Sequence, residues 1–426
     1  MILIKNGRLI NPKTNQDTIT DILIGEGKIL KIGEISDSKT LKKCEKIIDA
    51  TNKIVAPGLI DAHVHFRDPG FTYKEDIKTG AMSAAAGGFT TVICMANTNP
   101  LVDNLETLIY VRRRAKETKI NVLNTAAISV GFKGEVLTDM ETLKNNGAVG
   151  FTDDGIPLKN AKVVMEAMKK AKELDLPLSF HEEDPTLIEN AGINAGEVAK
   201  HFSLGGAPRI SEDILVARDC LLALETGATI DIQHLSSKNS VRIIADAKKM
   251  GAKIFAEVTP QHFSQTEDVV LKIGALGKVN PPLRTEEDRL ALIDGLKNDV
   301  IDLIVTDHAP HSREEKSRDL KSAPSGMIGL ETALAVSITF LVKENHLSLI
   351  DVLRKMTVNP AKLYKLDSGS VEVGKNADIV IFDENEKWTV TDNFYSKSSN
   401  SSFIGYELYG KVKYTICNGE IVYENI

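Results

Sequence analysis

The chain has 426 residues, with 52 Lys and Arg against 59 Asp and Glu, so its net charge at pH 7 is −7. This mildly acidic balance argues against a nucleic-acid-binding face or an anionic membrane partner, and an aromatic content of 5% leaves few rings on which bases could stack. Four scattered cysteines, no cleavable signal pattern and no apolar stretch of bilayer length predict a soluble enzyme of the cytoplasm.

The two ends of the chain contain short apolar segments separated by glycine-containing turns. "MILIKNGRLI" and "DILIGEGKILKIGEI" lie near the start, and "ADIVIFD" and "KVKYTICNGEIVYENI" near the end. Asn418-Gly419 in the last segment is typical of a two-residue hairpin turn. We expect residues 1–55 and 366–426 to form one small β-sandwich domain, with the serine-rich stretch 395–402 as a flexible loop.

Residues 56–365 alternate apolar strand-like segments with amphipathic helical segments. Eight strand candidates occur, within residues 55–66, 90–96, 121–128, 148–154, 177–183, 229–236, 253–260 and 302–310. Helical periodicity appears in residues 104–118, 162–174, 214–227, 240–251 and 285–296, the last opening with a Thr285–Asp288 capping box. The pattern predicts an α/β fold of the (β/α)8 TIM-barrel type over residues 56–365. A doubly wound open sheet is the alternative.

The first strand candidate ends in "DAHVHFRDPG", with His63 and His65 two residues apart. Residues i and i+2 of a strand face the same way, so both imidazoles can aim at one point, as metal ligands must. Taken alone, the pair fits two partly exposed loop histidines equally well.

The other strand ends favour a metal site. Histidines and aspartates recur at the ends of strands four, five, six and eight: Asp153, Asp154, His181, His234, Asp307, His308 and His311. Barrel active sites are built from these carboxyl-terminal ends. Imidazole and carboxylate ligands without thiolate favour zinc over manganese or cobalt, and six ligands suit two metal ions.

Several motifs, in order along nearly the whole chain, resemble the dihydroorotase family of the longer bacterial type, within the amidohydrolase superfamily. They are "PGLIDAHVHFRDPGFTYKEDIKTG", "CMANTNP", "GFTDDG", "VTPQHF", "NPPLRTEEDRLALI" and "TDHAPHSREEK". The resemblance implies a zinc-dependent barrel with a β-sandwich flank. It also implies reversible hydrolysis of (S)-dihydroorotate to N-carbamoyl-L-aspartate in de novo pyrimidine biosynthesis.

The resemblance carries a ligand set for two zinc ions per subunit: His63, His65, Asp154, His181, His234 and Asp307. Many relatives bridge their metals with a carboxylated lysine at the end of strand four, where this chain has none. An aspartate takes that place in this type, and the 27-residue spacing to His181 points to Asp154, with Asp153 as the fallback.

The resemblance also implies how the site works. A metal polarises the ring amide while a metal-bound hydroxide attacks, and Asp307 acts as general base and then general acid. Arg67 grips the substrate carboxylate with its planar fork. The implied substrate-binding residues are His65, Arg67, Asn97, Asn280, His311, Ser325 and Gly326.

Two departures from the family pattern concern the shape of the pocket: Ala96 replaces a usual proline and Ser325 a common aromatic residue. His262 and His308 are expected to be packing groups, and the charged loop 312–326 is equally compatible with a lid and with a solvated loop.

The alternatives are a hydantoinase or allantoinase, and an inactive scaffold that supports aspartate transcarbamoylase. A homodimer and an association with aspartate transcarbamoylase are both compatible with the resemblance, whereas nucleic acid and membrane are not expected as partners.

Overall fold

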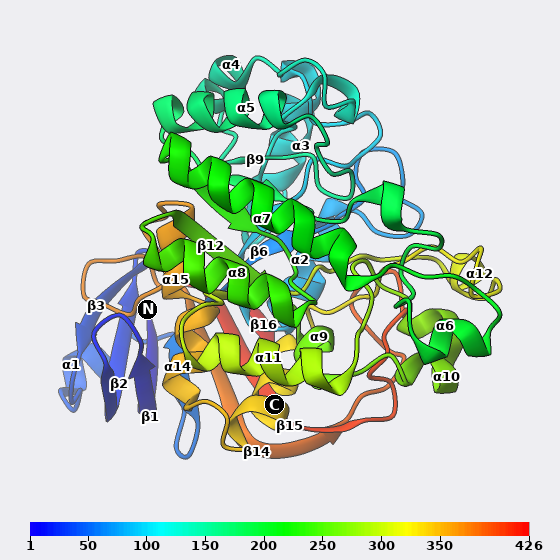
Figure 1. The fold of residues 1–426 in the computed structure, drawn as a ribbon. Helices are drawn as coiled ribbons and strands as arrows, with labels where there is room; N and C mark the ends of the chain where they lie inside the picture. The colour runs from blue at the N-terminus through cyan, green and yellow to red at the C-terminus, as the bar shows by residue number, and fades with distance from the viewer. Residues whose placement is uncertain (426) are drawn as a thin grey trace.

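The computed structural model describes residues 1–425 (Figure 1), and Ile426, the last residue of the predicted segment "KVKYTICNGEIVYENI", lies outside the described residues. It has one mixed sheet and two parallel sheets, with helices packed around the parallel strands. No helix among residues 1–425 is long and apolar enough to cross a membrane.

The mixed sheet draws its strands from both ends of the chain, as expected. Its members are β1 (Ile2–Asn11), β2 (Gln16–Gly25), β3 (Lys28–Ile32), β4 (Lys46–Asp49), β5 (Ile54–Pro57), β14 (Ile379–Thr389), β15 (Glu407–Cys417) and β16 (Glu420–Glu424). The hydrogen-bonded order is β16-β15-β14-β5-β1-β2-β3, with β4 paired to β1. Asn418 and Gly419 both have positive φ between β15 and β16, which confirms the predicted hairpin turn.

Each of the eight central strand candidates overlaps an observed strand of a parallel sheet. One sheet has the order β6-β7-β8, and the other β13-β12-β11-β10-β9. Their bounds are β6 (Leu59–Val64), β7 (Phe89–Cys94), β8 (Asn121–Asn124), β9 (Phe151–Thr152), β10 (Leu178–Phe180), β11 (Thr229–Ile232), β12 (Lys253–Val258) and β13 (Leu303–Ile304). All pairings are parallel, and isolated parallel bridges at Ala126–Phe151 and Val64–His308 connect the two sheets at both edges. The carboxyl ends of these strands therefore face one side.

Five of the longer helices coincide with the segments of helical periodicity: α3 (Leu105–Ala115), α5 (Ala161–Leu174), α7 (Arg209–Thr226), α8 (Lys238–Lys249) and α11 (Glu286–Lys297). Helices α5, α7, α8 and α11 lie side by side in chain order (Figure 1). The remaining α-helices are α1 (Ser38–Leu41), α2 (Ile77–Ala86), α4 (Met140–Asn145), α6 (Glu197–His201), α9 (Pro260–Ser264), α10 (Val269–Ile273), α12 (Arg313–Lys316), α13 (Ala333–Ser337), α14 (Leu349–Lys355) and α15 (Val358–Leu363).

Helix α5 illustrates how the sequence specifies these helices. Its buried residues recur every three or four positions and form one apolar stripe: Val163, Val164, Ala167, Met168, Ala171 and Leu174. The Asn160 side chain accepts the Lys162 N–H at the amino end, and Asp175 ends the helix in the left-handed conformation. In α11, the capping box between Thr285 and Asp288 forms as predicted.

The expectation that residues 395–402 form a flexible loop is wrong. Ser396, Ser398 and residues 400–402 are buried. The Ser396 hydroxyl donates to Glu75 Oε2, and the Ser398 hydroxyl donates to the Lys74 carbonyl at 2.7 Å. Serines are common in solvated loops, but here the hydroxyls of Ser396 and Ser398 donate to buried acceptors. Composition alone does not reveal such hydrogen bonds.

Two buried lysines hold the charged loop 312–326: Lys316 links residues within the loop, and Lys278 ties the loop to the body of the protein. Lys316 Nζ donates to the carbonyls of Pro324 and Gly326, both at 3.0 Å. Lys278 Nζ donates to three further carbonyls of the loop, at Leu320, Lys321 and Ala323. Several residues of the loop, including Arg313, Arg318 and Asp319, are nevertheless exposed, so the anchored segment fits both expectations, a lid and a solvated loop.

Candidate active site

His63 and His65 lie two residues apart at the end of β6. Successive side chains of an extended chain alternate in direction, so these two point to the same side. His63 is fully buried, and its Nδ1 lies 2.9 Å from Glu257 Oε2. His65 Nδ1 lies 2.8 Å from Asn97 Oδ1, and its Nε2 lies 2.9 Å from Asp307 Oδ1. In each ring a side-chain oxygen lies at hydrogen-bond distance from Nδ1, which favours the tautomer protonated there and leaves Nε2, the nitrogen that faces the aspartates, to ligate a metal ion. Metal-binding histidines are oriented in this way.

The ends of β9, β10, β11 and β13 bring four more side chains to the same point. Asp154 Oδ1 lies 3.4 Å from His63 Nε2 and 3.8 Å from both His181 Nδ1 and His234 Nε2. Asp307 Oδ1 lies 3.7 Å from His63 Nε2. The structure thus gathers all six sequence-predicted ligands into one buried cluster.

The two neighbouring aspartates after β9 have different surroundings. Asp153 accepts the backbone N–H groups of Ile128 and Ser129, at 2.7 and 3.0 Å, and the Ser129 hydroxyl. Burial raises the pKa of Asp153 to about 6 in spite of these hydrogen bonds. Asp154 instead faces the histidines. Only Asp154 therefore lies among the candidate metal ligands, while Asp153 holds the loop after β8.

The cluster has the properties of a cation site. His181 Nε2 lies 3.0 Å from Glu183 Oε2, which leaves Nδ1 as a lone pair only 2.9 Å from His234 Nε2. His63 Nε2 and Asp154 Oδ1 are buried and have no hydrogen-bond partner among the described residues. Facing lone pairs repel unless a proton or a metal ion lies between them, so these residues fit a metal ion.

The pKa shifts of the clustered histidines are also consistent with a cation site. Burial alone would lower the pKa of His63, but the charges of Asp154 and Glu257 outweigh burial and raise that pKa well above its usual value. At His234, burial together with His181 and His63 lowers the pKa well below its usual value. Within the described residues, two groups have ligand atoms all within 4.8 Å of one another: His63, His65 and Asp307, and His63, Asp154 and His234.

Three site residues adopt the left-handed backbone conformation that side chains other than glycine rarely take. Their φ angles are 58° at Arg67, 32° at His234 and 47° at Asp307. Each such residue costs roughly 1 kcal/mol or more, which the surrounding packing must offset. Strain of this kind concentrates where side chains must point in an unusual direction, here toward one cavity.

A cavity of about 190 Å³ opens above the cluster. Its lining includes all seven predicted substrate-binding residues: His65, Arg67, Asn97, Asn280, His311, Ser325 and Gly326. Burial lowers the pKa of Arg67, an effect that Asp307 and Asp154 oppose. Asn280 Oδ1 is buried without a hydrogen-bond partner among the described residues. The cavity is thus lined by a cationic side chain, Arg67, by candidate metal ligands and by a hydrogen-bond acceptor, Asn280 Oδ1, that has no partner among the described residues.

His311, one of the predicted substrate-binding residues, already has protein partners at both ring nitrogens. Its Nε2 lies 2.9 Å from the Ser325 carbonyl, which can only accept, so this nitrogen carries the proton. Its Nδ1 lies 3.3 Å from the buried Lys74 Nζ. Burial and the nearby Arg67 and Lys74 charges lower the pKa of His311 to about 3, so the ring is neutral. An anion that binds through His311 must displace its contact with Ser325.

Sequence reasoning did not identify Glu257, Glu183 and Lys74 as contributors to the site. A charged residue within the apolar strand segment "KIFAEV" is the signal that could have identified Glu257. The expectation for the remaining histidines agrees with the structure. His262 contacts Thr259 and the Pro281 carbonyl, and burial lowers its pKa to about 4. His308 faces Glu75 and the Gly329 N–H.

Comparisons with known proteins show the family to which the chain belongs. A Dihydro-orotase-like family model matches residues 52–240, and an Amidohydrolase family model matches residues 324–423. The chain is 59% identical over 423 residues to the dihydroorotase of Clostridioides difficile (strain 630), covering 99% of this chain and 100% of that protein. It is 56% identical to the dihydroorotase of Clostridium acetobutylicum over 426 residues, covering 100% of both.

Solved structures show the same fold. L-Hydantoinase (dihydropyrimidinase) from Arthrobacter aurescens superposes with a TM-score of 0.88 at 28% identity, covering 99% of this chain and 96% of that one. Dihydropyrimidinase from Brevibacillus agri NCHU1002 has a TM-score of 0.85 at 22% identity, covering 99% and 95%. The fold is therefore the α/β fold of amidohydrolases. With full-length identities above one half to two dihydroorotases, the chain belongs to the dihydroorotase family.

Proposed function

We propose that the chain catalyses the reversible hydrolysis of (S)-dihydroorotate to N-carbamoyl-L-aspartate, a step of de novo pyrimidine biosynthesis. One observation carries the proposal: Arg67 and the histidine–aspartate cluster line the same small cavity. Dihydroorotate has a cyclic amide and a carboxylate on one small ring, so it needs a carboxylate anchor close to the group that activates its amide.

We also propose the architecture that supports this site. Residues 56–365 form a (β/α)8 barrel, and residues 1–55 and 366–426 form a β-sandwich domain beside it. The parallel bridges Ala126–Phe151 and Val64–His308 support a closed ring of eight strands. A separate apolar core, shared by side chains such as Ile4, Ile22 and Ile379, supports a small domain built from both termini.

We propose that the candidate ligands hold two zinc ions per chain: His63, His65, Asp154, His181, His234 and Asp307. This donor set suits zinc because it combines imidazole nitrogens with carboxylate oxygens and has no thiolate. When bound, the metal would polarise the ring carbonyl and lower the pKa of the attacking water. Glu257 and Glu183 orient His63 and His181 by accepting their outer N–H groups.

Asp307 is assigned both proton transfers. It accepts the proton of the attacking water as general base and delivers that proton to the ring nitrogen as the amide bond breaks. Its position supports this role, because Oδ1 contacts His65 Nε2 at 2.9 Å while the residue also lines the cavity.

The remaining cavity residues bind the substrate. Arg67 grips the ring carboxylate bidentately, with His65, Asn97 and His311 on the same side. The unused Asn280 Oδ1 accepts a ring N–H, and the backbone at Ser325 and Gly326 completes the binding surface.

A second candidate is a hydantoinase or allantoinase, which the fold likeness to L-hydantoinase favours. Asp154 counts against it, since it occupies the strand end where those relatives ordinarily have lysine. A panel of dihydroorotate, hydantoin and allantoin, assayed together with metal analysis of the purified protein, tests both. We expect dihydroorotate to be the preferred substrate and about two zinc ions per chain. Faster turnover of hydantoin or allantoin would overturn the assignment, and no turnover of any substrate would favour an inactive scaffold.

We further propose that the enzyme works in the cytoplasm on small molecules alone, as its net charge of −7 favours. A homodimer and a complex with aspartate transcarbamoylase are its proposed assemblies. Sedimentation velocity of the chain, alone and mixed with aspartate transcarbamoylase, tests both. A monomer that does not shift on mixing would contradict them.

A further inference from the structure

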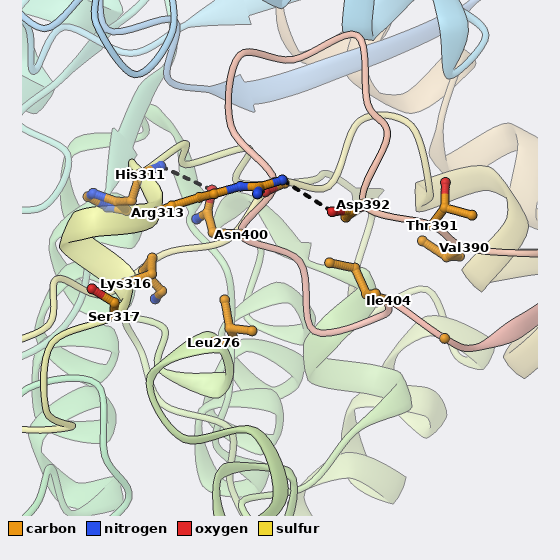
Figure 2. Close-up of a pocket in the computed structure, with 12 residues that line it drawn as sticks. Leu276, His311, Arg313, Lys316, Ser317, Val390, Thr391, Asp392, Asn400 and Ile404 are labelled. Atoms are coloured by element: carbon orange, nitrogen blue, oxygen red, sulfur yellow. Dashed lines mark hydrogen bonds and ion pairs between the residues drawn. The ribbon is translucent and has the colours of Figure 1, made fainter.

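Asn400 reaches the candidate active site from outside the central strands. It lies in the connection between β14 and β15 of the mixed sheet, residues 390–406. Figure 2 shows Asn400 next to His311, with a dashed line between them. Both residues line a cavity of about 590 Å³ on the outer side of His311. Its other lining includes the apolar side chains of Leu276, Val390 and Ile404, and nothing in the structure shows what would occupy it.

Asn400 is buried, with 3% of the residue exposed. Both the oxygen and the nitrogen of its side-chain amide hydrogen-bond to backbone groups. Oδ1 accepts the His311 N–H at 3.1 Å. Nδ2 donates to the carbonyls of Ala309 at 3.2 Å and Gly326 at 3.1 Å. The backbone N–H can only donate and the two carbonyls can only accept, so these partners determine the orientation of the amide.

These three partners belong to the two loops that form one wall of the substrate cavity. The loops also contact each other, because the Ala309 N–H donates to the Met327 carbonyl at 2.8 Å and His311 Nε2 meets the Ser325 carbonyl. At Gly326, φ is +127° and an added Cβ would lie 2.8 Å from Ala309 Cβ, so the two backbones are in close approach. Asn400 adds hydrogen bonds to both loops from the side away from the substrate cavity.

We propose that Asn400 is a positioning residue for substrate binding: its amide holds the His311 and Gly326 backbones in the arrangement that receives the substrate. It touches neither the proposed metal ligands nor the cavity interior, so it acts through these neighbours. The inference rests on the proposed function, since it assigns a role in binding dihydroorotate. Displacements of about 1 Å in such walls are enough to change rates or affinities by factors of ten or more.

The test compares Asn400→Ala and Asn400→Asp with wild type in steady-state dihydroorotate hydrolysis. We expect KM to rise about tenfold or more in Asn400→Ala while kcat per folded, metal-loaded site changes less. Asn400→Asp keeps the acceptor for His311 but puts a carboxylate oxygen against two carbonyls, so its KM should rise at least as much. Metal content should match wild type in both. Ser399→Ala is the matched control, because the adjacent Ser399 hydroxyl contacts only Arg313 and should leave KM unchanged.

A double-mutant cycle with His311→Ala separates positioning from plain stabilisation. If Asn400 acts through His311, Asn400→Ala should raise KM by a smaller factor in the His311→Ala background than in wild type. Equal factors in both backgrounds, or a KM within about twofold of wild type in the single variant, would overturn the inference. If Asn400→Ala does not fold, Asn400→Ser replaces it in the same comparison. A wild-type enzyme that does not hydrolyse dihydroorotate would instead refute the proposed function, and the inference with it.

Discussion

Asp307 combines a strained backbone with a central position in the cluster, which makes its carboxylate the least replaceable group. Asp307→Asn keeps the shape and one oxygen ligand but cannot accept a proton. We expect kcat to fall by roughly a thousandfold, within the usual range for loss of a general base. Steady-state kinetics, with circular dichroism and metal analysis as controls, measures the effect. Activity within about tenfold of wild type would remove Asp307 from the proton-transfer role.

Arg67 and Asp307 both line the cavity, but among the described residues only Asp307 hydrogen-bonds to a histidine of the cluster. Arg67→Lys keeps a positive charge but loses the planar fork, and Arg67→Ala loses both. We expect KM for dihydroorotate to rise in both variants, by about a hundredfold in Arg67→Ala, with zinc content unchanged. Loss of metal from a folded Arg67→Ala variant would show that Arg67 supports the metal site instead.

At the scale of elements, β12 contributes to the site through Glu257, which contacts the candidate ligand His63 and does not line the cavity. Glu257 accepts the His63 Nδ1 proton at 2.9 Å, and both side chains are fully buried. We expect Glu257→Gln to weaken metal affinity by about ten- to a hundredfold. Dialysis against graded chelator, followed by metal analysis, measures this without relying on activity. Glu331→Gln is the control, because Glu331 contacts Ser83 and Tyr395 instead of the histidines. Equal metal retention in the two variants would contradict the role of Glu257.

Helix α11 provides a prediction about stability alone. Asp288 caps the helix and accepts two hydrogen bonds from Arg209, at 2.6 and 2.7 Å. Because Arg209 is about one-third exposed, we expect Asp288→Ala to reduce the free energy of unfolding by only roughly 1–3 kcal/mol. Urea unfolding at pH 7 measures the loss, and KM should not change. A change in KM would show coupling of the helix cap to the active site.

The interaction between Asp288 and Arg209 also predicts how the free energy of unfolding changes with pH. Burial alone would raise the pKa of Asp288, but hydrogen bonds from Arg209 and Thr285 outweigh it and hold the pKa below its usual 3.8. The native state therefore binds this proton less readily than the unfolded state. The stabilisation is fully present above pH 3.8 and is lost as the pH falls through the folded-state pKa. The difference between wild type and Asp288→Asn should shrink in that acidic range, and a constant difference would contradict this account.

Elements specified by short stretches of sequence were predictable. The capping box of α11, the Asn418-Gly419 hairpin and the eight central strand segments depend on neighbours in the chain, and all are present. Strand alternation could not separate Asp153 from Asp154, because β9 is only two residues long and ends before them, so the choice of Asp154 depended on the resemblance. The pairing of Glu257 with His63 and of Asn400 with His311 depends on packing between distant segments. A charge within an apolar strand marks Glu257 as unusual, but it does not identify His63 as its partner.

At the scale of the whole molecule, residues 390–406 connect the mixed sheet to the loops around the active site. Ser396 and Ser398 hydrogen-bond to Glu75 and Lys74 after β6, and Asn400 bonds to Ala309 after β13. The sheet built from both termini therefore contributes to the active site as well as to its own core. A substitution in this segment can change the substrate cavity without touching the substrate.

This connection predicts the dynamics of the segment. The amides of Ser398, Ser401 and Phe403 donate to acceptors at 2.9 to 3.2 Å, and the segment is largely buried. In hydrogen exchange followed by mass spectrometry, we expect a peptide spanning residues 396–403 to be protected nearly as well as β14. The exposed turn at residues 13–15 should exchange within seconds and serves as the internal reference. Exchange of residues 396–403 at the rate of that turn would mean that the segment opens freely, and Asn400 could then hold neither loop in place.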